Sequence, residues 1–156
     1  MRLKIKMAKE EKSFGAVVYY WDEKPYFLLL KNTLKTTYWE FPKGHAEENE
    51  NMLESAKREA IEETGIDNLV IVPGFKRVLR WFFRFKGQLI HKEAVYILLK
   101  ARKEDRNKAK ISEEHQEILW LDFEQAREKM KIKSNREMLE QAYQFITEFE
   151  KQKTLF

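Results

Sequence analysis

Cysteine is absent from the 156-residue sequence. Its absence excludes disulfide bonds, thiolate nucleophiles and zinc sites built from cysteine. No apolar run approaches the ~20 residues that a membrane-spanning helix requires, and the basic N-terminal stretch MRLKIKMAKEEK lacks the continuous apolar region of a signal peptide. We therefore expect a cytoplasmic protein that does not bind a membrane, and no feature of the sequence indicates a protein partner.

The composition is typical of a packed globular protein. Hydrophobic residues make up 43% and aromatic residues 13% of the chain, which argues against disorder. A chain of this length fits one domain, so we expect a single domain over residues 1–156. The net charge is +4, with 30 basic residues interspersed among 26 acidic ones. Such a surface attracts phosphate-bearing partners, including nucleic acid and nucleotides, although most of these charges are expected to be ordinary solvated groups.

The distribution of apolar and turn-forming residues predicts strands, then one helix, then strands, then two helices. Apolar and aromatic runs separated by polar turns predict strands over residues 13–21, 25–31, 74–87, 91–101 and 117–121. Capping residues predict the helices: Asn51 for the first, Asp122 for the second, and Ser134 with Glu137 as a capping box for the third. This order predicts an α/β fold in which a mixed sheet lies between helices.

The first predicted helix contains three glutamates at helical spacing. Glu59, Glu62 and Glu63 stand at positions i, i+3 and i+4, so their carboxylates converge on one helix face. Like charges at this spacing repel, and a divalent cation would offset that repulsion. Hard oxygen ligands favour Mg²⁺, with Mn²⁺ as an alternative, over zinc. The competing interpretation is a solvated acidic face balanced by Lys57 and Arg58.

The residues around this helix match a longer pattern. Gly44 is followed after five residues by Glu50 and, after seven more, by the run REAIEETGI at residues 58–66. With these positions, residues 44–66 resemble the Nudix box, and only Ala60 departs from it, at a position where a larger aliphatic side chain is usual. The resemblance implies a Nudix-type α/β/α sandwich that hydrolyses a nucleoside diphosphate linked to another group.

The same resemblance implies roles for individual residues of the box. The Gly44 position offers a backbone carbonyl to a metal ion. The positions of Glu59, Glu62 and Glu63 bind metal or activate water, and that of Arg58 orients the catalytic glutamate. The convergence of the three carboxylates on one helix face agrees with these implied roles.

Three further stretches resemble the asymmetric diadenosine tetraphosphate hydrolases within that family. They are YWEFPKGHAE, HKEAVYILLKA and SEEHQEILWLDFEQA. The resemblance implies that Lys43 and Lys92 bind phosphate and that Glu114 is a metal ligand or a base that positions water. It also places Phe83 near an aromatic residue that stacks on adenine. Alternatively, Lys92 guards a sheet edge and Phe83 is an ordinary core residue.

The leading hypothesis is Mg²⁺-dependent hydrolysis of a dinucleoside polyphosphate, such as diadenosine tetraphosphate to ATP and AMP, by attack of water on phosphorus. The runner-up is an RNA 5′-pyrophosphohydrolase or a broader nucleoside triphosphate pyrophosphohydrolase, which the basic composition and the aromatic strand favour. A third hypothesis is a catalytically silent nucleotide-binding module, against which the complete set of carboxylates argues. Tyr38 stands where animal members carry histidine, and a second base-stacking aromatic is missing near KSNREM, so the contact to the second nucleoside stays open.

Overall fold

The computed structural model describes residues 8–32, 38–46, 49–112 and 115–154. Its strands are β1 (Lys9–Trp21), β2 (Pro25–Asn32), β3 (Trp39–Glu40), β4 (Lys43–Gly44), β5 (Leu69–Phe85), β6 (Gln88–Ala101) and β7 (His115–Asp122). Its helices are α2 (Met52–Thr64), α3 (Phe123–Lys129) and α4 (Lys133–Lys153), with a 3₁₀ helix η1 (Lys103–Lys108) in the charged connection after β6. Within these described ranges, no helix has the length and apolar character needed to cross a lipid bilayer.

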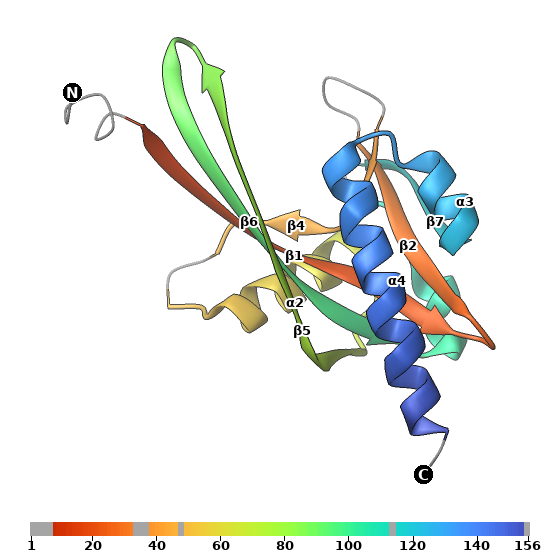
Figure 1. Ribbon diagram of the computed structural model, residues 1–156. Coiled ribbons are helices and arrows are strands. Elements are labelled where there is room, and N and C mark those ends of the chain that lie inside the picture. The colour runs from red at the N-terminus through yellow and green to blue at the C-terminus, as the bar shows by residue number, and fades with distance from the viewer. Residues whose placement is uncertain (1–7, 33–37, 47–48, 113–114, 155–156) are drawn as a thin grey trace.

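The predicted mixed sheet is confirmed. The strands β3, β2, β1, β6 and β5 follow one another in a seven-stranded sheet, while β4 pairs with β1 and β7 pairs with β2 (Figure 1). β1 and β6 run parallel, from Lys9 opposite Ile90 to Tyr19 opposite Lys100. The remaining pairs are antiparallel, including the β1–β2 and β5–β6 hairpins that the sequence predicts. β1 therefore joins the two halves of the sheet.

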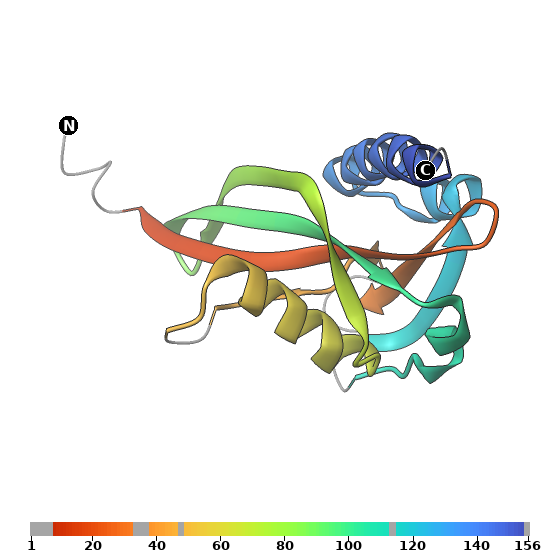
Figure 2. The ribbon, with the colours of Figure 1, turned by 90° about the horizontal axis from the view of Figure 1, so that it is seen from below.

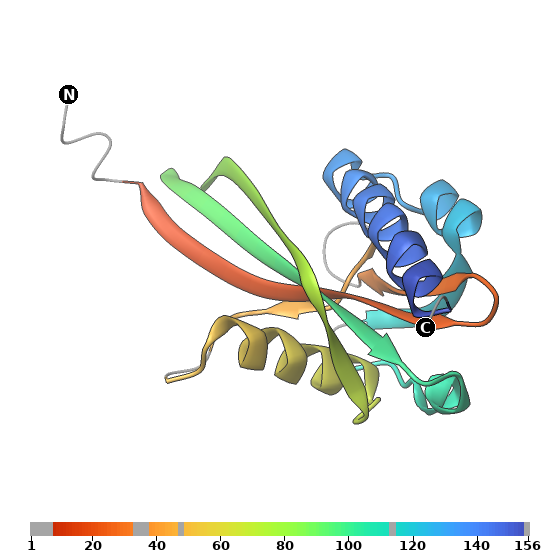
Figure 3. The ribbon, with the colours of Figure 1, turned by 60° about the horizontal axis from the view of Figure 1, so that its bottom comes forward.

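Helices cover both faces of the sheet, as the predicted α/β/α sandwich requires. α2 lies on one face, whereas α3 and α4 lie on the other (Figures 2 and 3). Because side chains alternate along a strand, β1 contributes to two hydrophobic cores. Val17 and Tyr19 belong to the core that includes residues of α3 and α4, and Ala16 and Val18 belong to the core that includes residues of α2.

The two predicted ends of α2 are confirmed. Asn51 caps the helix, since its side-chain oxygen accepts a hydrogen bond from the backbone N–H of Glu54 at 2.8 Å. Gly65 ends it in the left-handed conformation with φ of 77°. Ala56 and Ala60 are fully buried against the sheet. Such small side chains allow the helix backbone to lie close to the strands, which explains why alanine is accommodated at position 60.

β5 begins at Leu69, five residues before its predicted start at residue 74. Proline and glycine inside a strand normally disturb pairing, because proline lacks a backbone donor. The register between β5 and β6 shifts between Val72 and Lys76, and this irregularity accommodates Pro73 and Gly74. The strand therefore includes residues 69–73, which lie outside the predicted strand.

α4 begins at Lys133, earlier than predicted. Ile132 occupies the N-cap position and makes no side-chain hydrogen bond there. The predicted capping box of Ser134 and Glu137 is therefore wrong, because Ser134 lies within the first helical turn. The helix is held by packing instead: Met138, Leu139, Ala142 and Ile146 are buried in the core. Tertiary packing, rather than a local cap, stabilises this helix.

Gly15 allows β4 to approach the middle of β1. Gly15 pairs with Lys43, and the neighbouring Ala16 N–H donates to the carbonyl of Pro42 at 3.0 Å. A Cβ atom at Gly15 would lie 2.7 Å from both the Pro42 carbonyl oxygen and a ring carbon of Tyr96. The absence of a side chain at position 15 thus fixes where the loop before α2 meets the sheet.

Replacing Gly15 by alanine should lower the free energy of unfolding by about 1–3 kcal/mol, because the backbone at Pro42 must move to admit the new methyl group. Urea unfolding followed by circular dichroism measures this loss. Gly87→Asn is the control, because a Cβ atom there meets nothing within 4 Å and asparagine tolerates the positive φ of this turn. Equal losses in the two variants would contradict the steric explanation.

Candidate active site

The short strand β4 brings the loop before α2 into contact with two glutamates of that helix. The backbone N–H of Lys43 donates a hydrogen bond to Oε2 of Glu63 at 3.1 Å. A Cβ atom at Gly44 would overlap the carboxylate of Glu59, so only glycine leaves room for that side chain. Glu59 and Glu63 stand one helical turn apart and therefore both face β4.

Arg58 links the acidic side chains around this loop. Its Nε donates to Glu50 at 2.8 Å, and its Nη1 lies 3.0 Å from a carboxylate oxygen of Glu59 and 3.0 Å from one of Glu62. Its Nη2 donates to the backbone carbonyl of His45 at 3.0 Å. The hydrogen bond to Glu50, followed by the contacts with Glu62 and Glu59, raises the pKa of Arg58 well above its usual value. The guanidinium offsets repulsion among the carboxylates and fixes their positions relative to the loop.

The three glutamates predicted to share one function occupy different surroundings. Glu63 is 6% exposed and the side chain of Glu59 is 16% exposed, whereas the side chain of Glu62 is 57% exposed. Glu59 and Glu63 lie against β4, and Glu62 pairs with Arg58 at the rim. The structure thus brings Glu59, Glu63 and Gly44 together and leaves Glu62 beside them.

The oxygen atoms at this loop fit a hard divalent cation in their chemistry. Glu59 and Glu63 supply carboxylates, and the Cβ-free Gly44 places its backbone against the first of them. Carboxylate and carbonyl oxygens are the ligands that Mg²⁺ and Mn²⁺ prefer. In the described ranges, no three side chains of aspartate, glutamate, histidine or cysteine already gather closely enough to form a metal site. Glu114, the predicted ligand from outside the helix, lies outside the described residues.

A cleft of about 560 Å³ opens beside β4. Side chains of β5 and β6 form one wall, and the start of α4 forms another. The lining residues are Tyr38, Glu40, Lys43, Leu79, Arg80, Trp81, Tyr96, Ile132, Ser134, Asn135 and Glu137. Small-molecule sites typically measure about 300–1,000 Å³ and combine apolar walls with a few polar groups. The cleft therefore has the size and lining of a site for a nucleoside.

Lys43 and Lys92, both predicted to bind phosphate, lie close enough for the positive charge of Lys43 to act on Lys92. Lys43 lines the cleft, and the ammonium group of Lys92 lies 3.6 Å from a carboxylate oxygen of Glu11. Burial lowers the pKa of Lys92, and the positive charge of Lys43 lowers it further against the opposing effect of Glu11. An anion beside the two lysines would relieve their repulsion and favour the charged form of Lys92. This pair therefore suits a phosphate group.

Trp81 lines the cleft, whereas Phe83 lies beyond its lining residues. Both side chains stand on the same face of β5, with Trp81 opposite Lys92 and Phe83 opposite Ile90. Phe83 is therefore two residues nearer the turn of the β5–β6 hairpin. Stacking of adenine on Phe83 stays a prediction. The sequence shows that these aromatic residues share one face of the strand. Which of them reaches the cleft depends on the register between β5 and β6, which the sequence does not show.

Sequence reasoning missed a buried carboxylate in the wall of the cleft. Glu40 is buried, and its Oε1 accepts a hydrogen bond from the side-chain amide of Asn32 at 2.8 Å. Burial, followed by the negative charge of Glu40, raises the pKa of Tyr38 and of Tyr96, so both phenols stay protonated. The only signal in the sequence is the position of this acid between two core aromatics. Glu40 and the two phenols supply hydrogen-bonding groups to the same cleft that Lys43 lines.

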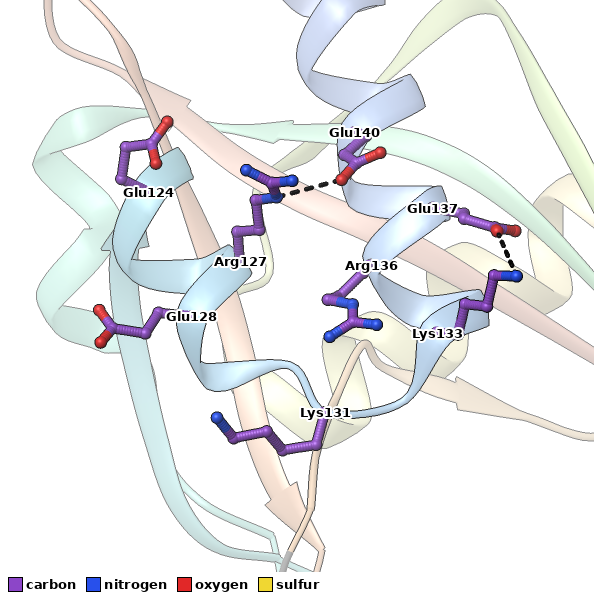
Figure 4. A pocket seen from close by; sticks show the side chains of 8 residues that line it. All are labelled: Glu124, Arg127, Glu128, Lys131, Lys133, Arg136, Glu137 and Glu140. Atoms are coloured by element: carbon purple, nitrogen blue, oxygen red, sulfur yellow. Dashed lines mark hydrogen bonds and ion pairs between the residues drawn. The ribbon is translucent and has the colours of Figure 1, made fainter.

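A larger hollow of about 770 Å³ lies between α3 and α4 (Figure 4). Its lining consists of charged residues: Glu124, Arg127, Glu128, Lys131, Lys133, Arg136, Glu137 and Glu140. Arg127 pairs with Glu140 at 3.1 Å, and Lys133 with Glu137 at 4.0 Å. This hollow offers no apolar wall to a base and contains none of the predicted site residues. The cleft beside β4 is therefore the candidate active site.

Comparisons with known proteins show which family the chain belongs to. The family described as NUDIX domain matches residues 10–142. The asymmetrical bis(5′-nucleosyl)-tetraphosphatase of Mus musculus is 37% identical over 123 residues, which cover 77% of this chain and 80% of the mouse protein. The corresponding enzyme of Rattus norvegicus is 34% identical over 122 residues, with the same shares covered. The crystal structure of a C. elegans Ap4A hydrolase in a binary complex has a TM-score of 0.75 and 29% identity, covering 87% of this chain and 97% of the other.

Replacing Lys92 by methionine should raise the melting temperature at pH 7. Because the folded state lowers the pKa of Lys92, the unfolded chain binds its proton more tightly, with a pKa near ~10.4. Lys92 therefore lowers the free energy of unfolding. This loss is present in full below the pKa of Lys92 in the folded state, and it disappears as the pH rises from that pKa to the pKa of the unfolded chain. Thermal denaturation at pH 7 measures the gain.

Inorganic triphosphate should raise the melting temperature of the wild type more than that of Lys92→Met, because binding to the folded state stabilises it. Lys76→Met, a substitution of an exposed lysine on β5, is the matched control. It should change neither the melting temperature at pH 7 nor the rise in melting temperature that triphosphate causes. A Lys92→Met variant that melts below the wild type at pH 7 would show that the ion pair with Glu11 outweighs the effect of burial.

Proposed function

Since the chain belongs to the Nudix family and is a hydrolase of phosphoric anhydrides, we propose that it hydrolyses dinucleoside polyphosphates, with diadenosine tetraphosphate as substrate. The names of the mouse, rat and C. elegans relatives support this choice of substrate. The proposed products are ATP and AMP, as expected for an asymmetric cleavage. We place this activity in the cytoplasm, in line with the expectation from the sequence.

The continuity between the cleft and the glutamates of α2 is the observation that carries the proposal. Lys43 belongs to both, because its side chain lines the cleft while its backbone N–H is bonded to Glu63. A nucleoside in the cleft would extend its phosphate chain past Lys43 towards Glu59 and Glu63. Lys92 supplies a second cation beside Lys43. Along this path the substrate would meet a cleft of the size of a base, then the lysines that bind its phosphates, and then the carboxylates that accept a proton from water.

In the proposed reaction, a water oxygen attacks the phosphorus nearest one adenosine. The bond from that phosphorus to the bridging oxygen breaks, and the departing ATP keeps the electron pair. The AMP receives the water oxygen, and a carboxylate of Glu59 or Glu63 accepts the proton from water. Arg58 holds Glu59 in position for this step. Lys43 and Lys92 neutralise the negative charge that develops along the phosphate chain.

Nudix hydrolases generally use divalent metal ions, and we propose Mg²⁺, with Mn²⁺ as an alternative. Glu59, Glu63 and the carbonyl of Gly44 would hold the ion, with Glu62 and Glu114 as further candidate ligands. Bound there, the ion would polarise a phosphoryl oxygen and lower the pKa of water. The role of Arg58 is independent of the ion, because its contacts already fix the loop and the helix.

The glutamates of α2 should differ in their effect on turnover. Glu59→Gln and Glu63→Gln should each lower kcat by about two orders of magnitude or more, because each removes a carboxylate that lies against β4. Glu62→Gln removes an exposed ion pair and should lower kcat by about tenfold or less. Steady-state kinetics with diadenosine tetraphosphate and Mg²⁺ measures all three.

Glu54→Gln is the control on the same helix. Its backbone N–H remains available to Asn51, so it should leave kcat unchanged and cost less than about 1 kcal/mol of stability. Inactivation by Glu54→Gln as complete as that by Glu63→Gln would contradict the division of α2 into a cap and an active-site face.

The identity of the products tests the proposed function directly. Cleavage at a phosphorus set by its distance from the base in the cleft should give ATP and AMP rather than two molecules of ADP. In ¹⁸O-labelled water, the label should appear in AMP, which mass spectrometry detects. Two ADP products would refute the asymmetry, and label in ATP would move the attack to the other side of the bridging oxygen. Binding without any turnover would indicate a nucleotide-binding module instead.

A further inference from the structure

The β5–β6 hairpin has an uneven distribution of charge. Residues 68–92 contain six lysine or arginine residues and no aspartate or glutamate, although acidic residues make up 26 of the 156 in the chain, one in six. These residues include all of β5, the turn and the first part of β6. A basic stretch of this length is complementary to a polyanion.

Exposed aromatic rings occupy the same hairpin. Trp81, Phe83 and Phe85, here called the aromatic row, alternate onto one face of β5 and are 38%, 37% and 49% exposed. Successive members stand about 7 Å apart along the strand, from a rise of ~3.4 Å per residue. Phe82 is 63% exposed on the opposite face, where its ring stacks on His91. Contiguous exposed apolar surface of this kind marks an interaction site.

The aromatic row leads out of the candidate active site. Trp81 lines the cleft, and Phe85 borders the turn, which extends away from α4 (Figures 1 and 3). Cations accompany the row at the turn: the Lys86 ammonium lies 5.4 Å from the centre of the Phe85 ring, and Arg84 donates to the carbonyl of Gly87 at 3.3 Å. Lys92 stands opposite Trp81 at the other end of the row, so a polymer that starts in the cleft would meet three rings with a cation at each end.

We propose that the hairpin binds single-stranded RNA whose 5′ end enters the cleft. The proposal rests on the proposed function for the position of the 5′ phosphate, beside Lys43 and Lys92. Unpaired bases stack on aromatic rings without regard to sequence, while arginine and lysine hold the backbone phosphates. A strand free of carboxylates avoids repulsion with the phosphodiester chain. This one occupant explains both the aromatic row and the cations beside it.

A second copy of this chain fits the same surface less well. Dimers commonly form about a twofold axis, which would place identical surfaces against each other. Two copies of residues 68–92, which contain no aspartate or glutamate, would then meet with like charges, which disfavours association. RNA brings the opposite charge to the same surface. The positive charge of the hairpin therefore favours RNA over a second copy of this chain.

Fluorescence anisotropy with a labelled, 5′-monophosphorylated oligouridylate of twelve nucleotides tests the proposal. This probe contains no phosphoric anhydride, so it is not consumed when Mg²⁺ is present. Phe85→Ser should weaken its binding by about tenfold, the scale of one lost stacking contact. Phe82→Ser removes a comparably exposed ring from the opposite face and should change the affinity by less than about twofold. Lys86→Gln should reduce the slope of the logarithm of affinity against the logarithm of salt concentration by roughly 0.7, the value for one phosphate contact.

Turnover of diadenosine tetraphosphate, measured in parallel, separates this proposal from the proposed function. Phe85→Ser should retain it, because residue 85 lies outside the cleft. Equal affinities of Phe85→Ser and Phe82→Ser for the oligouridylate would overturn the RNA platform even if the dinucleotide is cleaved. Loss of a dimer in Phe85→Ser by analytical ultracentrifugation, with unchanged RNA affinity, would also overturn it. Phe85-dependent RNA binding without dinucleotide turnover would support the platform and refute the proposed function.

Discussion

The guanidinium group of Arg58 is the interaction on which the acidic face of α2 depends. It contacts carboxylates of Glu50, Glu59 and Glu62 and also the backbone carbonyl of His45. Without a cation among them, carboxylates at helical spacing would repel and turn towards solvent. Arginine suits this position because its planar, permanently charged fork holds several acceptors in fixed directions, whereas a lysine ammonium is a single point charge. Glu50 is itself held by the hydroxyl of buried Ser55 at 3.1 Å, so the arrangement is anchored inside the helix.

The elements of the fold could be predicted wherever the signal is local. Asn51 and Gly65 mark the ends of α2 in the sequence and do so in the structure, because a cap and a left-handed stop depend only on adjacent residues. The start of α4 could not be found in this way. Its beginning at Lys133 depends on Met138 and Ala142 meeting the sheet, and tertiary packing outweighs a local capping motif.

The candidate site also has one part that the sequence predicts and one part that it does not. The Nudix box is a continuous segment, so the resemblance of the chain to the family could be recognised from the sequence. The comparisons confirm that the chain belongs to this family. The cleft is assembled from β3 and β4, the β5–β6 hairpin and the start of α4, which are three separate parts of the chain. Glu40 and Tyr96 therefore gave no signal of their proximity, and Trp81 could not be distinguished from Phe83 without the register of β5 on β6. Sequence patterns predicted which residues carry the chemistry, whereas the pairing of distant strands determines which residues line the cleft.

The parallel pairing of β1 with β6 has a consequence for how the chain acquires its structure. Lys9 lies opposite Ile90, so the central pair of the sheet closes a loop of about 80 residues. Contacts between residues this distant in sequence slow folding, since the chain must lose loop entropy before the pairing stabilises it. During synthesis, the β1–β2 hairpin can form early, but one edge of β1 has no partner until β6 has left the ribosome. The nascent chain thus carries an unpaired strand edge until β6 emerges, a state that favours contact with chaperones.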